Sequence, residues 1–249
     1  MTARRRVPAV GREVGPESCS IEHRHEILHG LPFFAHLSSE ALAEINQQFY
    51  ATGYAAGETV YFSGDPAERL FVVAHGEVKL LRHSAGGQDV LLDILGEGEM
   101  FGTLTVLGDR SYPDTAVAQT PCCVLGISAA DFQTILARVP EVALAVLGLV
   151  AERLQNAHDT ISQISATPVE SRVAAALLKL AEKLGVQDDR GVLIKTRLSR
   201  QDLAAMTGTT TETASRIMSQ FRRDGLIESG REWIIVTNAA QLEQIASEA

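Results

Sequence analysis

Apolar and polar residues alternate over short segments in the first half of the chain. From about Gly53 to Ile127, β-rich runs such as "ETVYF", "RLFVVA", "VKLLRH" and "VLLDIL" are separated by glycine-centred turns. Short strands at this spacing are typical of an antiparallel sandwich or roll, not of a parallel sheet. Just before them, "SSEALAEINQQF" predicts a short helix that is capped by Ser38 and buries one apolar face. That face consists of Leu42, Ile45 and Phe49.

The pattern changes to a helical period from Pro140 to about Ala166. Apolar residues recur there at intervals of three and four, as in the seam of a coiled coil. The seam positions are Leu147, Val150, Leu154, Ala157, Ile161 and Ile164. At about 1.5 Å per residue the helix would be roughly 40 Å long, which is enough to join two copies of the chain. The alternative is that the seam packs on the roll of its own chain.

A new helix is predicted directly after this one. In "TPVE", Thr167 is a helix cap, Pro168 suits the first helical position and Glu170 completes a capping box. The break between the two helices predicts a hinge between two domains.

The segment "TRLSRQDLAAMTGTT" predicts a short helix followed by a tight turn. Ser199 is a good N-cap with Asp202 three residues later, and Gly208 suits the left-handed position that ends a helix. Thr209 or Thr210 can then cap the next helix. Two helices joined in this way form a helix-turn-helix, whose second helix enters the major groove of DNA. The following "LIESGREWIIVTN" predicts a hairpin, so the unit is a winged helix-turn-helix.

The second helix, "TETASRIMSQFRRDGLI", has two different faces. Glu212, Ser215 and Arg216 lie at i, i+3 and i+4 and share one face, whereas Ile217 and Met218 point the other way. Carboxylate, hydroxyl and guanidinium groups can meet a cytosine amine, a thymine edge and a guanine in the major groove. The three polar residues are therefore candidates for reading bases. The alternative is an ordinary amphipathic surface helix.

Charge supports a DNA-facing surface in this region only. The chain carries 22 Lys and Arg against 31 Asp and Glu, a formal net charge of −9, but residues 168–249 are balanced. Between Lys195 and Arg223, basic residues outnumber acidic ones by six to two. Such a local excess is suited to phosphate groups. The predicted phosphate contacts are Arg200, Thr209, Thr210, Thr211 and Arg222.

Length and composition indicate two globular domains in a protein without a membrane segment. The 249 residues exceed one ordinary domain. The basic start "MTARRR" is not followed by the apolar run of a signal peptide, and the longest apolar run, Val142 to Ala151, is too short to cross a bilayer. We therefore expect a cytoplasmic protein.

Four features occur together in this chain: "GETVYFSGDPAERLFVVAHGEVKL", the seamed helix, the capped hinge and "TETASR". Over about Leu31 to Thr237 they resemble the CRP/FNR superfamily of bacterial transcription factors. The resemblance implies an α+β fold with an antiparallel β-roll like the cyclic-nucleotide-binding jelly roll, a dimerisation helix and a C-terminal winged helix-turn-helix. It also implies a homodimer that binds palindromic promoter DNA and RNA polymerase.

The resemblance divides the chain into four parts. These are a flexible N-terminal arm at 1–30, the β-roll sensor domain at 31–138, the dimerisation helix and hinge at 139–167, and the DNA-binding domain at 168–249. An enzyme is not expected, because His75 and His83 stand alone on predicted strands and no catalytic constellation is present in the sequence.

The recognition helix is similar to that of the regulator of fumarate and nitrate reduction, which carries E-x-x-S-R. Glu212, Ser215 and Arg216 match this spacing, whereas the cyclic AMP receptor has a glycine in place of Ser215. The similarity implies TTGAT-like half-sites, with Arg216 on G, Glu212 on the opposed C and Ser215 near a T.

The stretch "MFGTLTVLGDRSYPDTAVA" departs from the cyclic AMP binders of the superfamily. Those proteins hold ribose and phosphate with a Gly-Glu pair and a later Arg-Ser pair. Here Thr103 follows Gly102, and Tyr112 and Pro113 occupy the Arg-Ser place. A buried cyclic phosphate without a guanidinium lacks its charged partner, so cyclic AMP is not the expected effector. Gly102, Thr103 and Tyr112 remain candidates for lining a pocket in the roll.

The oxygen-sensing branch of the superfamily holds an iron–sulfur cluster on four cysteines. In "PESCSIEHRHEIL" only Cys19 remains, with Pro16 and His25 at two of the other ligand places. Cys122 and Cys123 are adjacent on a predicted strand, so they point to opposite faces and are poorly placed to bind one metal together. A four-cysteine cluster is therefore not expected.

A group of histidines near the N-terminus supplies candidate ligands for a centre that senses a gas or redox signal. His23, His25 and His29 follow Cys19, and imidazoles with a thiol can bind iron or haem. Nitric-oxide-responsive members of the superfamily without the cluster cysteines use haem. The alternative is a solvated segment. We therefore expect a regulator of this type that responds to a redox or gas signal. One alternative is a regulator that depends on a cyclic nucleotide or needs no effector. Another is a ligand-binding module that does not bind DNA.

Overall fold

The computed structural model shows two compact units. It describes residues 20–83, 89–103, 111–196, 198–230 and 232–247. The first unit comprises Met1–Arg82 and Asp93–Leu149, and the second comprises His83–Leu92 and Val150–Ala249.

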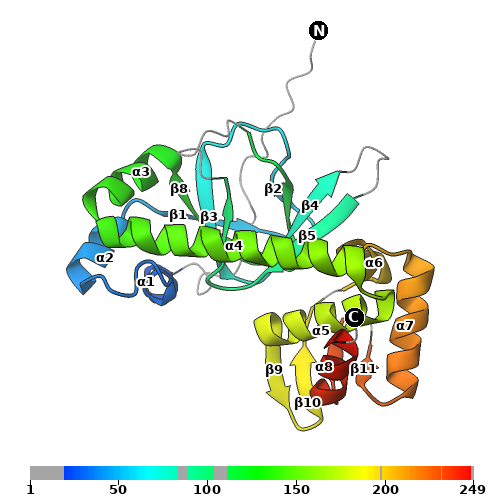
Figure 1. The fold of residues 1–249 in the computed structure, drawn as a ribbon. Coiled ribbons are helices and arrows are strands. Elements are labelled where there is room, and N and C mark those ends of the chain that lie inside the picture. Colours follow the sequence, from blue (N-terminus) through cyan, green and yellow to red (C-terminus); the bar gives the residue numbers. More distant parts are fainter. Residues whose placement is uncertain (1–19, 84–88, 104–110, 197, 231, 248–249) are drawn as a thin grey trace. The chain divides into compact units, whose positions relative to one another are not determined.

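An antiparallel β-roll made of two sheets forms most of the first unit (Figure 1), although its residues His83 and 89–92 group with the second unit. Its strands are β1 (Tyr50–Tyr54), β2 (Thr59–Tyr61), β3 (Arg69–His75), β4 (Val78–His83), β5 (Asp89–Leu95), β6 (Met100–Gly102), β7 (Thr115–Ala118) and β8 (Cys122–Ser128). One sheet has the order β1-β8-β3-β6 and the other β2-β7-β4-β5. β8 pairs with both β1 and β3 in antiparallel register, and β7 pairs with β2 and β4 in the same way. The prediction of an antiparallel roll is confirmed.

Helices pack against the β1-β8-β3-β6 sheet. They are α1 (Ile21–Gly30), α2 (Ser39–Asn46), α3 (Ala129–Arg138) and the first part of α4 (Pro140–Ala166). Their apolar faces form one core with the sheet, which includes Leu28, Phe34, Leu42, Leu125, Phe132 and Val142. The hydroxyl of Ser38 accepts a hydrogen bond from the N–H of Ala41 and caps α2, as the sequence predicts.

α1 corrects the prediction of a flexible arm over residues 1–30. Leu28 is 0% exposed in the core. Nε2 of His23 lies 2.8 Å from the carbonyl oxygen of Ala74, and Nη2 of Arg24 donates to Oδ1 of Asn46 over 2.8 Å. Residues 20–30 therefore belong to the folded unit, and residues 1–19 lie outside the described part. The sequence signal is weak because most of α1 is polar, so few apolar positions mark its buried face.

Aromatic side chains fill the interior between the two sheets of the roll. Tyr61, Phe71, Phe101 and Tyr112 belong to one buried cluster. The rings of Tyr61 and Tyr112 are stacked with centroids 3.8 Å apart, and Phe71 and Phe101 stack at 5.2 Å. This second core holds the sheets together by apolar burial and ring stacking.

α4 has the bounds that its periodic pattern predicts, and its two faces differ. Val142 and Val146 are buried in the core of the first unit. Leu144, Leu147 and Leu154 are instead 70%, 64% and 56% exposed. Two predicted seam residues, Leu147 and Leu154, are therefore largely exposed.

The seam differs in detail from its prediction. Leu144, which the heptad assignment leaves out, is the most exposed of the three leucines, while Val150 is only partly exposed and Ala157 is exposed. The side chains of Ile161 and Ile164 lie outside the described part, although their backbone is helical.

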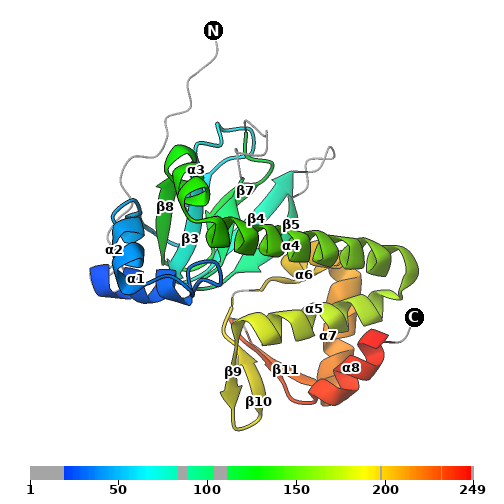
Figure 2. The same ribbon diagram turned by 60° about the vertical axis from the view of Figure 1, so that its left-hand side comes forward.

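The second unit is a helical domain with a small sheet. Its elements are α5 (Val169–Leu184), β9 (Gly185–Asp188), β10 (Gly191–Ile194), α6 (Arg200–Met206), α7 (Thr211–Arg223), β11 (Ile227–Ser229), β12 (Ile234–Val236) and α8 (Ala239–Ser247). The antiparallel sheet has the order β11-β12-β10-β9. Figure 2 shows α8 (red) alongside α5, with which it is in contact. The helix-turn-helix is α6 and α7, and the predicted hairpin is β11 and β12.

The predicted cap at the start of α5 is wrong. Pro168 is the N-cap, with φ −57° and ψ 152° in the extended region, and no side-chain hydrogen bond caps the helix. Because Pro168 is extended, Val169 is the first helical residue, and Thr167 and Glu170 stand one position away from where a capping box needs them.

No single helix among the described residues is long and apolar enough to span a membrane.

Candidate nucleic-acid interface

The α6–α7 turn is built by local hydrogen bonds. Ser199 and Asp202 form a capping box at the start of α6, since each side chain accepts from the backbone N–H of the other. Gly208 has φ 60°, and the N–H of Thr209 donates to the carbonyl oxygen of Ala204. The left-handed glycine lets the chain reverse direction within a few residues. The predicted turn is confirmed.

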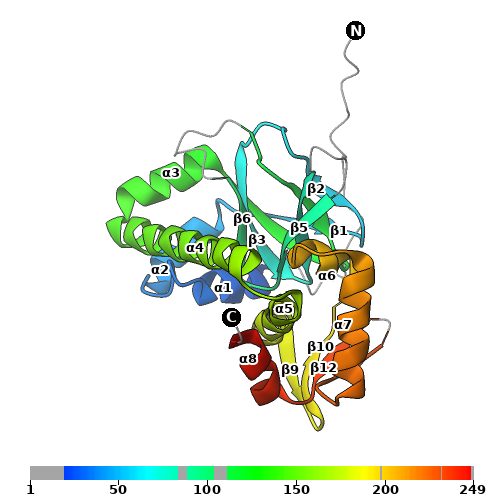
Figure 3. The ribbon, with the colours of Figure 1, turned by 45° about the vertical axis from the view of Figure 1, so that its right-hand side comes forward.

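α7 begins with a threonine cap and packs through one face. The Oγ1 of Thr210 accepts from the N–H of Thr213 over 3.2 Å, so Thr210 and not Thr209 is the cap. The buried residues of α7 are Ala214, Ile217, Met218 and Phe221. α7 contacts α6 and α5 on this side, as Figure 3 shows. The packing leaves the opposite face of α7 open.

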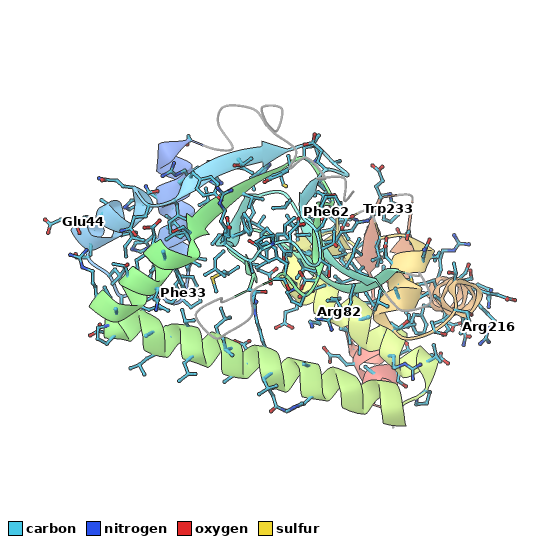
Figure 4. The ribbon with its side chains drawn as sticks, turned by 90° about the horizontal axis from the view of Figure 1, so that it is seen from above. Phe33, Glu44, Phe62, Arg82, Arg216 and Trp233 are labelled. Atoms are coloured by element: carbon cyan, nitrogen blue, oxygen red, sulfur yellow. The ribbon has the colours of Figure 1, made fainter. Side chains whose placement is uncertain are left out.

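The predicted base-reading residues lie on that open face. Glu212 and Arg216 are exposed and Ser215 is half-buried. Figure 4 shows Arg216 on the outer side of α7 (orange). Within the described residues, neither Glu212 nor Arg216 forms an ion pair. Their polar groups therefore stand together at the surface, as the i, i+3, i+4 spacing predicts.

Among the predicted phosphate contacts, the charge of Arg222 acts on Arg200. Burial lowers the pKa of Arg200, and the like charge of Arg222 lowers the same pKa further. No acidic side chain of the described residues pairs with either guanidinium. Two cations that approach each other without a carboxylate form a place where an anion is stabilised.

The predicted threonines differ in how available they are. Thr211 and Thr210 are exposed, and Thr209 is half-buried. The hydroxyl of Thr210 also donates to Oγ1 of Thr213 over 2.9 Å. Thr210 therefore has a structural role as the α7 cap, while the hydroxyl of Thr211 faces solvent at the first turn of α7.

A polar cluster in the small sheet could not be predicted from the sequence. Arg190 donates from Nε to Asp188 over 3.0 Å and from Nη1 to Glu228 over 2.8 Å. Its guanidinium also lies 5.7 Å from the centroid of a Trp233 ring. The single tryptophan of the chain is the only sequence signal for it, because the partners come from three separate strands and loops. Arg190 is therefore held by partners within the second unit.

Two of the predicted pocket residues of the roll, Tyr112 and Gly102, lie close to the backbone of Arg69. The hydroxyl of Tyr112 donates to the carbonyl oxygen of Arg69 over 2.9 Å and accepts from its N–H at 3.2 Å. Gly102, with φ 93°, brings its backbone close to the same carbonyl oxygen. Thr103 follows it and is half-buried. Tyr112 itself is 4% exposed, so it is a core side chain whose hydroxyl is used by the backbone.

Two buried phenols lie in this part of the roll interior. Burial raises the pKa of Tyr112 to about 12. Burial, followed by the neighbouring Asp114, raises the pKa of Tyr61, whose hydroxyl donates to Oδ1 of Asp114 over 2.8 Å. Both phenols therefore stay protonated at neutral pH.

The predicted metal-binding residues are only partly brought together. The rings of His25 and His29 are stacked with centroids 6.5 Å apart, whereas Nε2 of His23 is placed against the carbonyl oxygen of Ala74. Cys19 lies outside the described residues. In the part of the chain that the structure describes, no group of three or more His, Cys, Asp or Glu side chains is arranged to hold a metal.

The adjacent cysteines of β8 point to opposite faces, as predicted. Cys122 belongs to the core between the sheets and Cys123 to the core beneath the helices. Burial raises the pKa of the Cys122 thiol to about 12. Cys122 is therefore a protonated core residue and not a thiolate ligand.

Comparisons with known proteins agree with this arrangement. The model of the "Cyclic nucleotide-binding domain" matches residues 52–139, and that of the "Crp-like helix-turn-helix domain" matches residues 171–245. The chain is also 33% identical over 219 residues to the Cyclic AMP receptor protein of Thermus thermophilus, which covers 88% of this chain and 98% of that protein. The chain belongs to the CRP/FNR family of transcriptional regulators.

Other family members show the same likeness over nearly their whole length. The Global nitrogen regulator of Synechococcus elongatus is 31% identical over 218 residues, which cover 86% of this chain and 95% of that protein. The solved structure of FixK2 from Bradyrhizobium japonicum has the same fold, with a TM-score of 0.73 at 24% identity over 81% of this chain and 98% of the other.

Membership in the CRP/FNR family assigns a role to each of the two matched regions of the chain. Residues 171–245, which include α6 and α7, are the DNA-binding part of a transcriptional regulator, and residues 52–139 are its cyclic-nucleotide-binding-like roll. Its relatives are transcriptional regulators, so the chain is a DNA-binding regulator and not an enzyme. Regulators of this family bind promoter DNA and typically act as dimers with RNA polymerase.

Proposed function

We propose that this CRP/FNR regulator reads a palindrome of TTGAT-like half-sites through Glu212, Ser215 and Arg216. The observation that carries the proposal is that all three lie on the outer face of α7, with Glu212 and Arg216 exposed and, among the described residues, without an ion pair that would occupy them. A bidentate guanidinium suits the O6 and N7 atoms of guanine, and a carboxylate accepts from the N4 amine of cytosine. Together they select a G·C pair in a fixed orientation.

Arg200 and Arg222 are the proposed phosphate contacts on the same unit. The like charge of Arg222 lowers the pKa of Arg200, and a phosphate bound by both guanidinium groups would relieve this repulsion. The exposed Thr211 supports a further contact, because hydroxyls and N–H groups at a helix start commonly bind phosphate oxygens. Thr209 and Thr210 complete the proposed set at the turn.

A homodimer is proposed through the exposed stripe of α4. Leu147 and Leu154 are large apolar side chains, and their exposure to solvent in a single chain is unfavourable. With Val150, Ala157, Ile161 and Ile164 they continue the periodic seam, so a second α4 would cover them. A two-fold pair of chains presents two copies of α7, which is why the site should be a palindrome with half-sites about one DNA turn, roughly 34 Å, apart.

The proposed signal is redox or gaseous rather than cyclic AMP. The support is the buried Tyr112, which stands where cyclic AMP binders carry an arginine and whose hydroxyl is already used by Arg69. Cys19, His25 and His29 remain the proposed ligands for haem or another metal, while His23 is turned to Ala74. We also propose that the protein acts in the cytoplasm together with RNA polymerase.

A cyclic-nucleotide-dependent regulator is the second candidate. It is favoured by the match to the cyclic nucleotide-binding domain and by the likeness to a relative that is named Cyclic AMP receptor protein. Calorimetric titration with cyclic AMP separates the candidates, because saturable heat would support the second one. Haem uptake with a Soret band that shifts on nitric oxide addition would support the first.

Titration of the full chain on short duplexes tests whether the protein selects the proposed base sequence. One duplex carries inverted TTGAT half-sites, and the matched control exchanges the single G·C pair of each half-site for C·G. We expect the control to bind about tenfold or more weakly, since one wrong base pair costs roughly 1–3 kcal/mol in each half-site. Equal affinity for both duplexes would contradict the proposed reading.

A further inference from the structure

Arg172 on α5 donates hydrogen bonds to backbone carbonyls at two distant points of the second unit. Its Nη1 donates to the carbonyl oxygen of Thr167 over 2.8 Å, at the junction between α4 and α5. Its Nε donates to the carbonyl oxygen of Thr207 over 2.8 Å, and its Nη2 lies 3.5 Å from that of Gly208. One guanidinium therefore joins the α4–α5 junction to the α6–α7 turn.

The turn that Arg172 holds determines where α7 begins. Thr207 is the C-cap of α6, is 2% exposed and donates from its hydroxyl to the carbonyl oxygen of Leu203. Thr210 caps α7 only two residues after Gly208. Recognition helices contact bases with their N-terminal residues, so the position of this turn sets the position of the reading side chains.

The contact suits arginine for two physical reasons. The last carbonyls of a helix carry the negative end of its dipole, so a cation at the end of α6 is stabilised there. The planar guanidinium also spreads its N–H groups over several acceptors, which an ammonium cannot do in the same geometry. The backbone N–H of Arg172 donates to the carbonyl oxygen of Pro168, so the residue is fixed in the first turn of α5.

We propose that Arg172 is a positioning residue for DNA reading, which fastens the α6–α7 turn to the α4–α5 junction so that both move as one body. The proposal rests on the function proposed above, in which α4 pairs two chains and α7 reads bases. In this proposal, Arg172 affects DNA binding by fixing the positions of Gly208 and Thr210, and Arg172 itself does not contact DNA. A change at the α4–α5 junction would then reach the reading helix through this guanidinium.

The test compares Arg172→Lys with wild type in the full chain. Arg190→Lys is the matched control, because it makes the same exchange in the same unit at an arginine that holds Asp188 and Glu228 and not the turn. The DNA is the site that wild type selects from a random-sequence library, measured at several salt concentrations. Hydrogen exchange of the free proteins is followed at residues 207–211 and over the rest of the second unit.

We expect Arg172→Lys to lower affinity for the selected site about tenfold or more, because several charge-assisted hydrogen bonds are lost. Non-specific affinity and the salt dependence should stay as in wild type, and exchange should become faster at residues 207–211. Arg190→Lys should change none of these.

Three outcomes would overturn the proposal. Unchanged affinity and exchange in Arg172→Lys would show that the contact positions nothing. A salt dependence reduced by about one unit in Arg172→Gln, which removes the charge that lysine keeps, would show a direct phosphate contact. A uniform loss of protection across the unit would show a general loss of stability. If wild type selected no palindrome, the proposed function would fail, and the exchange comparison would still decide the role of Arg172.

Discussion

Arg216 is the residue on which base discrimination depends most in this account. Its exposed guanidinium can make a bidentate contact with guanine, so Arg216→Ala should cost about 1–3 kcal/mol of binding and relax selectivity at one base pair. Arg216→Lys is the matched control, since it keeps the charge but loses the fork. Quantitative site selection with each variant measures both effects. An unchanged base preference in Arg216→Ala would remove Arg216 from the reading set.

Cys122 gives a pH dependence that follows from its burial. The pKa of the thiol is raised to about 12 in the folded chain from 9.0. Its stabilising contribution is therefore complete below pH 9 and is lost as pH rises towards 12, since the unfolded chain releases a proton that the folded chain keeps. We expect the free energy of unfolding to fall by up to about 1.4 kcal/mol per pH unit from this group.

The matched variant for this effect is Cys122→Ala, and urea unfolding between pH 8 and about 10, below most of the tyrosine range, is the measurement. The variant should lose less stability over this range than wild type does. Equal pH slopes would show that Cys122 does not titrate differently in the two states.

At the scale of elements, the exposed stripe of α4 leads to a prediction about assembly. Leu147→Glu places a charge in the first position of the proposed seam, where the side chain is exposed, and should convert a dimer into a monomer with weaker binding to the palindrome. Glu152→Gln is the control on the same helix, because Glu152 is not a seam position. Sedimentation velocity measures the oligomeric state. A dimer that persists in Leu147→Glu would place the interface elsewhere.

Elements with local signals could be predicted from the sequence, and those fixed by distant contacts could not. The α6–α7 turn follows from Ser199, Asp202 and Gly208, whose hydrogen bonds and positive φ are decided within a few residues. α1 was missed because Leu28 finds its partners in helices and strands far along the chain. The cap expected at Thr167 failed because the extended Pro168 shifts the helix start by one residue.

At the scale of the whole molecule, the DNA-reading surface was predictable to a greater extent than the effector site. Glu212, Ser215 and Arg216 share a face by helical spacing alone, and the structure shows that face exposed. Arg172 could not be found from the sequence, because its acceptors are backbone carbonyls up to 36 positions away. Tyr112 was expected to line a pocket, yet its ring packs on Tyr61 within the core. Side-chain packing of this kind is decided only in the folded roll.

The central claim is that two copies of α7 read an inverted repeat through Glu212, Ser215 and Arg216. Selection of binding sites by the wild-type full chain from a random-sequence duplex library tests it most directly, because no site is assumed. The account predicts enrichment of two TTGAT-like half-sites in inverted order, with centres about one DNA turn apart. Enrichment of single, unpaired sites, or of half-sites without the G·C pair assigned to Arg216 and Glu212, would contradict it.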